Sequence, residues 1–247
     1  MLETSFMFRG ARVTRVGRGR APAAEALVLF PGFPGHPLPP GALSGPPKMR
    51  VEIAKALVRE LALDAYMPGY PGLETPGGFS FQCALASGIE LCRQLSRRYR
   101  RIHAAGHSWG AFVAINAHRA LGDGAGRLVL LSGLLELRHE EDVRKFLPYY
   151  LANFPQVFGP AERAFARAFA DLDAARRSGS PSAPAERMSA ETLLIVHGRR
   201  DAEIPADSSR RFHARAGGRY VELDADHGYT RALPLLSAVV RSFFSGG

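Results

Sequence analysis

Short apolar runs alternate along most of the chain with longer stretches that carry apolar residues at helical spacing. The apolar runs predict strands at Ala26–Phe30, Ala65–Met67, Ile102–Ala105, Leu128–Leu131, Thr192–Val196 and Tyr220–Leu223. The stretches between them predict helices at Lys48–Leu63, Phe81–Arg98, Gly110–Leu121, Asp207–Ala216 and Ala232–Phe244. This alternation is typical of a mainly parallel sheet with helices on its faces. We therefore expect an α/β fold with a doubly wound sheet.

The alternation is interrupted in the middle of the chain. Apolar and aromatic residues recur there at helical spacing, first from Val143 to Phe154 and then from Phe165 to Leu172. The segment Ser178–Pro184 (SGSPSAP) follows, and its composition predicts a linker. We expect a core domain interrupted by an inserted helical cap or lid, with the core at residues 1–133 and 189–247 and the insertion at 134–188.

The charge of the chain raises the question of a polyanionic partner. The formal net charge is +9, and the 32 basic residues comprise 29 Arg and 3 Lys. The arginines are spread along the whole chain, with two denser groups at Arg9 to Arg20 and at Arg93 to Arg101. The second group follows a predicted helix, where the helix dipole favours cations. Because no nucleic-acid-binding motif accompanies the charge, we expect no nucleic-acid partner.

The two cysteines and the distribution of apolar residues bear on the compartment. Cys83 and Cys92 lie nine residues apart within one predicted helix, where they cannot easily form a disulfide. No apolar run approaches the length of about 18 to 20 residues that would cross a bilayer. We expect a soluble, cytoplasmic protein with no membrane partner, no cofactor and no metal site.

One motif carries a strong chemical signal. Gly106-His107-Ser108-Trp109-Gly110 fits the pattern Gly-x-Ser-x-Gly, and it follows a predicted strand and opens a predicted helix. A turn of this kind exposes the serine hydroxyl on a strained backbone, and it needs small residues on either side. Ser108 is therefore the candidate nucleophile, with a helix-capping serine as the alternative.

A serine nucleophile needs a base and a carboxylate that orients the base. After a serine on such a turn, the acid and then the histidine follow along the chain. His227 comes directly after the last predicted strand and is the candidate base. Asp201 follows the preceding strand and is the candidate acid, although it could be a simple turn residue. Glu136, just beyond the strand that ends at Leu131, is the competing acid.

In these features the chain resembles an α/β-hydrolase with a small lid, from Ala26 to Phe244. In that family the turn after an early strand supplies one backbone amide of the oxyanion hole. The matching segment here is Pro31-Gly32-Phe33, in which Pro replaces the family's His. The resemblance implies that the amides of Phe33 and Trp109 form the oxyanion hole. Residues 66–72 (YMPGYPG) also resemble a family loop, with Tyr in place of its Asp.

The resemblance implies acyl transfer to water on a small-molecule acyl substrate. The predicted insertion is rich in aromatic residues, among which Phe146, Tyr150 and Phe154 are candidates for a substrate pocket. These side chains could instead only pack the lid onto the core. We expect a carboxylic-ester hydrolase. The alternatives are a thioesterase acting on coenzyme A or an acidic carrier protein, a peptidase that holds a substrate amine with an acidic lid residue, and a non-catalytic binding protein.

Overall fold

The computed structural model describes residues 1–19, 21–33, 48–73, 77–135, 137, 139–179 and 187–246. At its centre is an eight-stranded sheet in the order β1-β2-β4-β3-β5-β6-β7-β8. The strands are β1 (Leu2–Phe8), β2 (Ala11–Gly17), β3 (Glu25–Phe30), β4 (Asp64–Pro68), β5 (Arg101–His107), β6 (Ala125–Leu131), β7 (Leu193–Gly198) and β8 (Arg219–Leu223). Strands β3 to β8 pair in parallel, whereas β1 and β2 join the sheet antiparallel. The expected mainly parallel α/β fold is confirmed.

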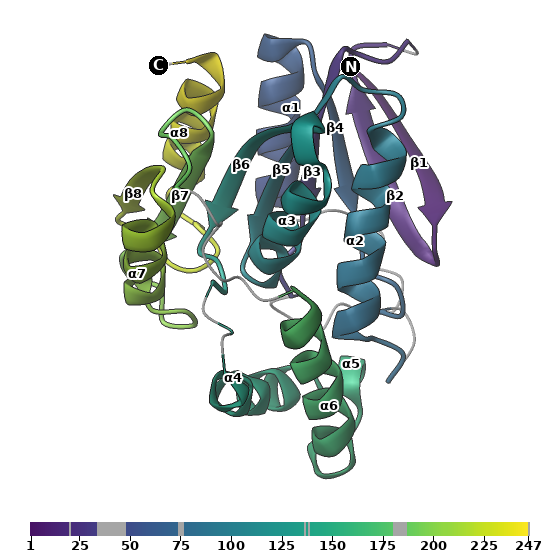
Figure 1. Ribbon diagram of the computed structural model, residues 1–247, viewed down its shortest axis with the longest axis vertical. Coiled ribbons are helices and arrows are strands. Elements are labelled where there is room, and N and C mark those ends of the chain that lie inside the picture. The colour runs from purple at the N-terminus through teal and green to yellow at the C-terminus, as the bar shows by residue number, and fades with distance from the viewer. Residues whose placement is uncertain are drawn as a thin grey trace.

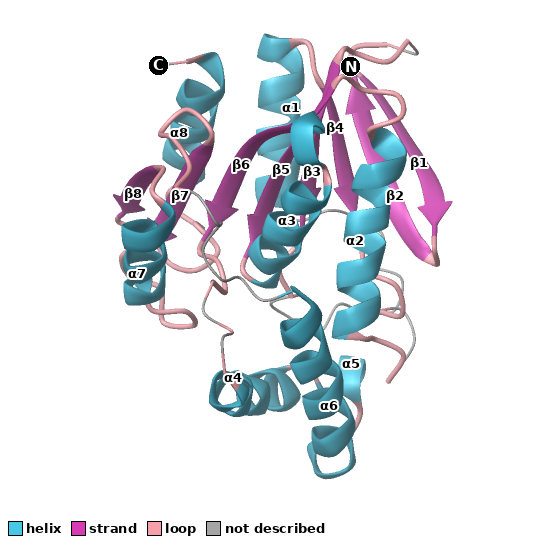
Figure 2. Ribbon diagram, in the orientation of Figure 1, coloured by secondary structure: helices cyan, strands magenta, loops and turns pink. Residues whose placement is uncertain are grey.

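Helices cover both faces of this sheet (Figure 2). The helices are α1 (Lys48–Leu61), α2 (Phe81–Leu95), α3 (Trp109–Ala120), α4 (Glu140–Asn153), α5 (Pro155–Phe158), α6 (Ala161–Gly179), α7 (Ala206–Ala216) and α8 (Leu233–Ser245). The apolar faces of α1 and α8 pack into one core, and those of α2 and α3 pack into another. The predicted helices of the core domain are all present, with ends shifted by a few residues.

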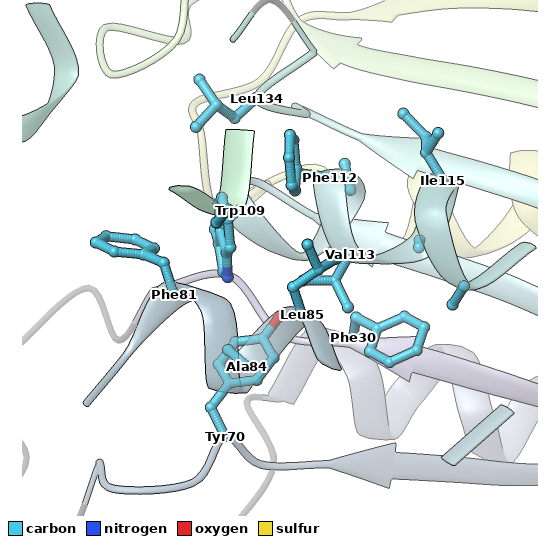
Figure 3. Close-up of a cluster of buried hydrophobic side chains, with 14 of the residues drawn as sticks. Phe30, Tyr70, Phe81, Ala84, Leu85, Trp109, Phe112, Val113, Ile115 and Leu134 are labelled. Carbon is cyan, nitrogen blue, oxygen red and sulfur yellow. The ribbon is translucent and has the colours of Figure 1, made fainter. Parts of the chain in front are cut away.

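The larger core lies beneath α2 and α3 and extends to the site described below. Figure 3 shows Trp109, at the first position of α3, between Phe81 of α2 and Phe112 of α3. The Trp109 ring stacks on Phe112 at 4.8 Å and meets the edge of Phe81 at 4.9 Å. Aromatic pairs in these geometries stabilise a core beyond their buried area. The start of α3 is therefore fixed firmly against α2.

The sequence pattern predicted no strand before Ala26, and β1 and β2 correct it. They form a hairpin whose turn, Arg9 and Gly10, has φ angles of 48° and 79°. Two consecutive positive φ values are typical of a two-residue hairpin loop. The β1 strand is an edge strand whose central residues are exposed on both sides. It therefore lacks the one-sided apolar alternation that would have identified it.

The segment between β6 and β7 contains α4, α5 and α6. Figure 1 shows these helices beyond the carboxyl ends of the parallel strands, at the end of the molecule away from both termini. Ser178 and Gly179 belong to α6, so the predicted linker was wrong at these two residues, and residues 180–184 of it lie outside the described part. That residues 134–188 form a separate lid stays a prediction.

Several charged and sulfur-containing side chains have structural surroundings. Arg15 pairs with the buried Asp64 at 2.9 Å, and Arg18 donates to carbonyls at the end of α1. Cys83 and Cys92 both lie on α2 and are unpaired. No helix in the described part of the chain has the length and apolarity needed to cross a bilayer.

Candidate active site

Ser108 lies in the turn between β5 and α3. Its backbone angles are φ 55° and ψ −123°, a conformation that L residues rarely adopt and that surrounding structure must enforce. Ser108 occupies the N-cap position of α3, but its side chain makes no capping hydrogen bond. The structure therefore does not give its hydroxyl the role of a helix cap. The hydroxyl is left for other contacts in the site.

The glycines that flank Ser108 are required by close backbone approaches. A Cβ atom at Gly106 would lie 2.0 Å from the carbonyl oxygen of Gly110, and one at Gly110 would lie 2.4 Å from that of Pro31. Neither approach leaves room for a side chain. This agrees with the prediction that the turn needs small residues on both sides of the motif.

The turn after β3 lies directly against the serine. A Cβ atom at Gly32 would lie 2.9 Å from the Cβ of Ser108 and 2.8 Å from Nδ1 of His107. On the other side of the serine, the amide of Trp109 belongs to the first turn of α3, where N–H groups have no intrahelical partner. Both predicted oxyanion donors, Phe33 and Trp109, therefore lie in segments adjacent to Ser108. Their role in an oxyanion hole stays a prediction.

His227 and Asp201 are brought together by the loops after β8 and β7. The His227 ring donates from Nδ1 to Oδ2 of Asp201 at 2.7 Å. Oδ1 of Asp201 accepts the backbone N–H groups of Glu203 and Ile204, each at 2.9 Å. A carboxylate held in this way can fix the tautomer and orientation of the imidazole, which leaves Nε2 free to accept a proton.

Two histidines act on the Asp201 carboxylate. His197, fully buried at the end of β7, places Nε2 3.2 Å from Oδ2 of Asp201. Burial acts to raise the pKa of Asp201, but the bonds from His197 and His227 outweigh it and hold that pKa well below its usual range. Asp201 is therefore ionised at neutral pH and can stabilise a protonated His227.

His107, at the variable position of the motif, holds the loop that carries His227. Burial and the neighbouring His227 lower the pKa of His107 to about 3, so its ring is neutral at ordinary pH. The ring donates from Nε2 to the backbone carbonyl of His227 at 2.8 Å, and the two ring centroids are 4.6 Å apart. His107 thus links the Ser108 turn directly to the His227 loop.

Ser108 is linked to His227 through His107, the residue that precedes the serine and contacts the His227 loop. No hydrogen bond between Ser108 and His227 is present in the described part of the chain, and Nε2 of His227 lies 3.8 Å from Oε2 of Glu203. Such bonds are often long in free enzymes and tighten only when substrate binds. The competing acid, Glu136, lies outside the described residues, so the structure does not compare it with Asp201.

An aromatic cluster surrounds the side chain of Phe33. The rings of Phe79, Tyr150, Phe81, Phe154 and Phe158 have centroids 4.8, 4.9, 5.4, 5.5 and 5.6 Å from that of Phe33. Burial raises the pKa of Tyr150, and hydrogen bonding of its hydroxyl with Ser108 offsets part of that rise. Two of the three predicted pocket residues, Tyr150 and Phe154, therefore lie close to the site. Phe146 is partly buried and makes no ring contact with Phe33 among the described residues.

Five acidic residues between β6 and β7 have structural partners. Asp171 accepts from Ser80 Oγ and from the N–H of Phe81 at the start of α2. Asp173 pairs with Arg176 and Arg177, and Asp142 caps α4. Glu140 and Glu141 form ion pairs with Arg144 and Lys145 along α4. These partners of the five carboxylates do not include Ser108.

Sequence reasoning missed four residues around the predicted pair. His107 and His197 had been given no part in the site, and Glu203 and Tyr229 were not considered. The buried Tyr229 donates to the carbonyl of Val196 and anchors the His227 loop to β7. Tyr149, on α4, is also linked to this region, because burial and a hydrogen bond with Glu203 raise its pKa to about 12. Among the described residues, no group of His, Cys, Asp and Glu side chains could hold a metal ion.

Comparisons with known proteins bear on the family and the fold of the chain. A sequence model of the alpha/beta hydrolase family matches residues 26–240. No curated protein matches the chain in sequence. Est1E from Butyrivibrio proteoclasticus is similar in structure, with a TM-score of 0.69, 16% identity and coverage of 99% of this chain and 98% of that one. A thermophilic esterase from Thermogutta terrifontis gives a TM-score of 0.63 at 15% identity, covering 100% and 99%. XC6422 from Xanthomonas campestris, described as an a/b serine hydrolase without lid, gives 0.60 at 17% identity, covering 98% and 93%.

Proposed function

The chain belongs to the alpha/beta hydrolase family, and we propose that it is a serine hydrolase that cleaves a carboxylic ester through an acyl-enzyme. One arrangement carries the proposal. Ser108 lies on a strained turn at the end of β5, and the His227–Asp201 pair lies beside it on the loops after β8 and β7. Nucleophile, orienting acid and base thus follow one another along the chain at the carboxyl ends of parallel strands, which is the order that this family uses.

In the proposed mechanism the Ser108 hydroxyl attacks the ester carbonyl while Nε2 of His227 takes its proton. Asp201 remains ionised and stabilises the imidazolium. The amides of Phe33 and Trp109 donate to the oxyanion of the tetrahedral intermediate. His227 then protonates the leaving alcohol, and the same groups activate a water that hydrolyses the acyl-enzyme.

The aromatic cluster supports an apolar acyl group as substrate. Rings from α2, α4 and α5 gather around Phe33 and reach Ser108 through Tyr150. Small-molecule sites are lined mainly by apolar and aromatic side chains. A structure of Est1E with bound ferulic acid, an aromatic acid, also resembles this chain, with a TM-score of 0.71 and 16% identity over 98% of both chains. We propose that α4, α5 and α6 act as the lid over this site.

A peptidase would need a free acidic group to hold a substrate amine. The described acidic residues of the insertion cap helices or form ion pairs, so they give this alternative little support. No described feature favours a thioesterase acting on coenzyme A or an acidic carrier protein. Peptidase and thioesterase activity are therefore measured beside esterase activity in the experiment below.

A substrate panel tests the proposal. We expect hydrolysis of p-nitrophenyl esters with apolar acyl groups, and kcat/KM lower by at least about tenfold for acyl-coenzyme A thioesters and aminoacyl amides. Ser108→Ala protein serves as the blank for each substrate. A preference for thioesters or amides would replace the proposed ester activity, and the absence of any activity dependent on Ser108 would contradict the mechanism.

A further inference from the structure

Arg50, in the first turn of α1, is a buried arginine beneath the carboxyl ends of two neighbouring strands. The residue is only 6% exposed. Its Nη1 donates to the carbonyls of Leu29 at 3.2 Å and of Pro68 at 3.0 Å. The ladder between β3 and β4 ends with Val28 paired to Tyr66. Arg50 therefore donates to one carbonyl of each strand, at the point where β3 and β4 no longer pair with each other.

The charge of Arg50 has no anionic partner in the described part of the chain. No acidic side chain pairs with it there, and its Nε has no hydrogen-bond partner. The segment 34–47, which leads into α1, contains no Asp or Glu. Burial lowers the pKa of Arg50 to about 10, and Tyr70 opposes this only in part. A buried cation without a counter-ion is costly, and a neutral side chain of similar size would pack here without that cost.

The bonds of Arg50 lead to the turn that holds a predicted oxyanion donor. Leu29 precedes the turn Pro31-Gly32-Phe33 by two residues, and the Tyr70 hydroxyl donates to the carbonyl of Pro31 at 2.7 Å. Arg50 and Tyr70 thus hold the carbonyls that lie four and two residues before Phe33. The positive charge of Arg50 also acts on His107 of the Ser108 motif. Together with burial and His227, it lowers the pKa of His107.

We propose that Arg50 is a positioning residue for the oxyanion hole, and that its charge is matched when the oxyanion forms. Its guanidinium fixes the strand end that leads to the Phe33 amide. It also places behind the site a positive charge that pairs with no acidic side chain among the described residues. The oxyanion is the negative charge that arises there during the proposed reaction, so the attraction strengthens in the transition state. This inference rests on the proposed serine-hydrolase function.

Three substitutions separate charge, hydrogen bonding and packing. Arg50→Lys keeps the charge, Arg50→Gln keeps a donor without charge, and Arg50→Met keeps similar bulk only. Arg59→Gln, an exposed position on the same helix, is the matched control. The readouts are kcat and KM for a short p-nitrophenyl ester, and the inhibition constant of an alkylboronic acid, which forms a tetrahedral anion on the nucleophile.

We expect Arg50→Gln and Arg50→Met to lower kcat by at least about tenfold with little change in KM. They should weaken the boronic acid by a similar factor, and Arg50→Lys should recover much of the loss. The control should match the wild type. If the folded Gln and Met variants keep kcat and boronic-acid affinity within about twofold of the wild type, the inference is overturned. If the wild-type protein shows no hydrolysis dependent on Ser108, the proposed function fails instead.

Discussion

At Asp201, hydrogen bonds from His227, Glu203 and Ile204 meet on one carboxylate. Asp201→Asn should keep most of these contacts but present an amide to Nδ1 of His227, which favours the wrong tautomer. We expect kcat for an ester to fall by about four orders of magnitude. Asp224→Asn, an exposed acid on the neighbouring loop that pairs with Arg200, is the control. If Glu136→Gln costs more activity than Asp201→Asn, Glu136 is the acid.

The neutral ring of His107 makes stability depend on pH. Its pKa is lowered from 6.5 to about 3 in the folded protein. Between these values the unfolded chain binds a proton that the folded chain does not. The contribution of His107 is therefore complete above the unfolded pKa and declines as the pH falls toward the folded one. The free energy of unfolding of His107→Gln, measured by urea at several pH values, should fall less steeply over this range. Parallel curves for the two proteins would contradict the assignment.

The residues of the site were predictable to the extent that local sequence positions them. Ser108 follows from a five-residue motif in its strand-turn-helix setting, and Asp201 and His227 follow from their places after strands. His107, His197 and Arg50 could not be found in this way, because their roles depend on tertiary contacts. His107 contacts the His227 loop, His197 contacts the Asp201 carboxylate, and Arg50 contacts the Leu29 carbonyl. A histidine or arginine looks the same in sequence whether it is buried or exposed.

Among the elements, the aromatic cluster joins α4 and α5 to the turn after β3. The Phe33 ring fills the space between Tyr150, Phe154 and Phe158. Phe33→Ala keeps the backbone amide and opens that space, so kcat/KM should shift toward longer acyl groups. Each added methylene contributes about 0.8 kcal/mol when buried, which is a few-fold in the ratio between neighbouring lengths.

A series of p-nitrophenyl esters, measured beside the melting temperature, tests this shift. Phe146→Ala is the matched control on α4, because Phe146 has no ring contact with Phe33 among the described residues. It should lower stability or all activities alike. Equal losses at every acyl length for Phe33→Ala would show that the cluster only packs the insertion onto the core.

The α6 helix is attached to α2 through Asp171. This carboxylate accepts from Ser80 Oγ at 2.7 Å and from the Phe81 N–H at 2.6 Å, so it caps the start of α2. Asp171→Ala should lower the free energy of unfolding in urea by about 1 to 2 kcal/mol. Glu141→Ala, which removes an exposed ion pair on α4, should cost less than about 0.5 kcal/mol. Equal effects of the two substitutions would contradict the capping role.

The strands and helices were predicted correctly where burial requires a recognisable pattern of apolar residues, and they were missed where the residues are exposed. The strands of the parallel core are buried and read as apolar runs, so their sequences identified them. The edge hairpin β1–β2 exposes most of β1 and was missed. Gly179 was assigned to a linker by composition, yet its carbonyl accepts from Asn116 of α3, a tertiary contact that no local pattern reveals.

At the scale of the whole molecule, the fold class followed from the alternation of strands and helices. The carboxyl ends of the parallel strands lie along one edge of the sheet. Ser108, Asp201 and His227 follow strand ends at this edge. Figure 1 shows α4, α5 and α6 beyond the same edge. The position of these three helices beyond the carboxyl ends of the strands therefore follows from topology. The substrate depends instead on side-chain packing, which topology does not determine.

Ser108 acts in the proposed mechanism as a nucleophile that His227 activates. The most direct measurement is covalent labelling with a fluorophosphonate, followed by intact-mass and peptide analysis. We predict a single adduct on the peptide that contains Ser108, none in Ser108→Ala, and labelling slowed by at least about a hundredfold in His227→Gln. Labelling that persists in folded Ser108→Ala protein, or that proceeds equally fast in His227→Gln, would contradict the account.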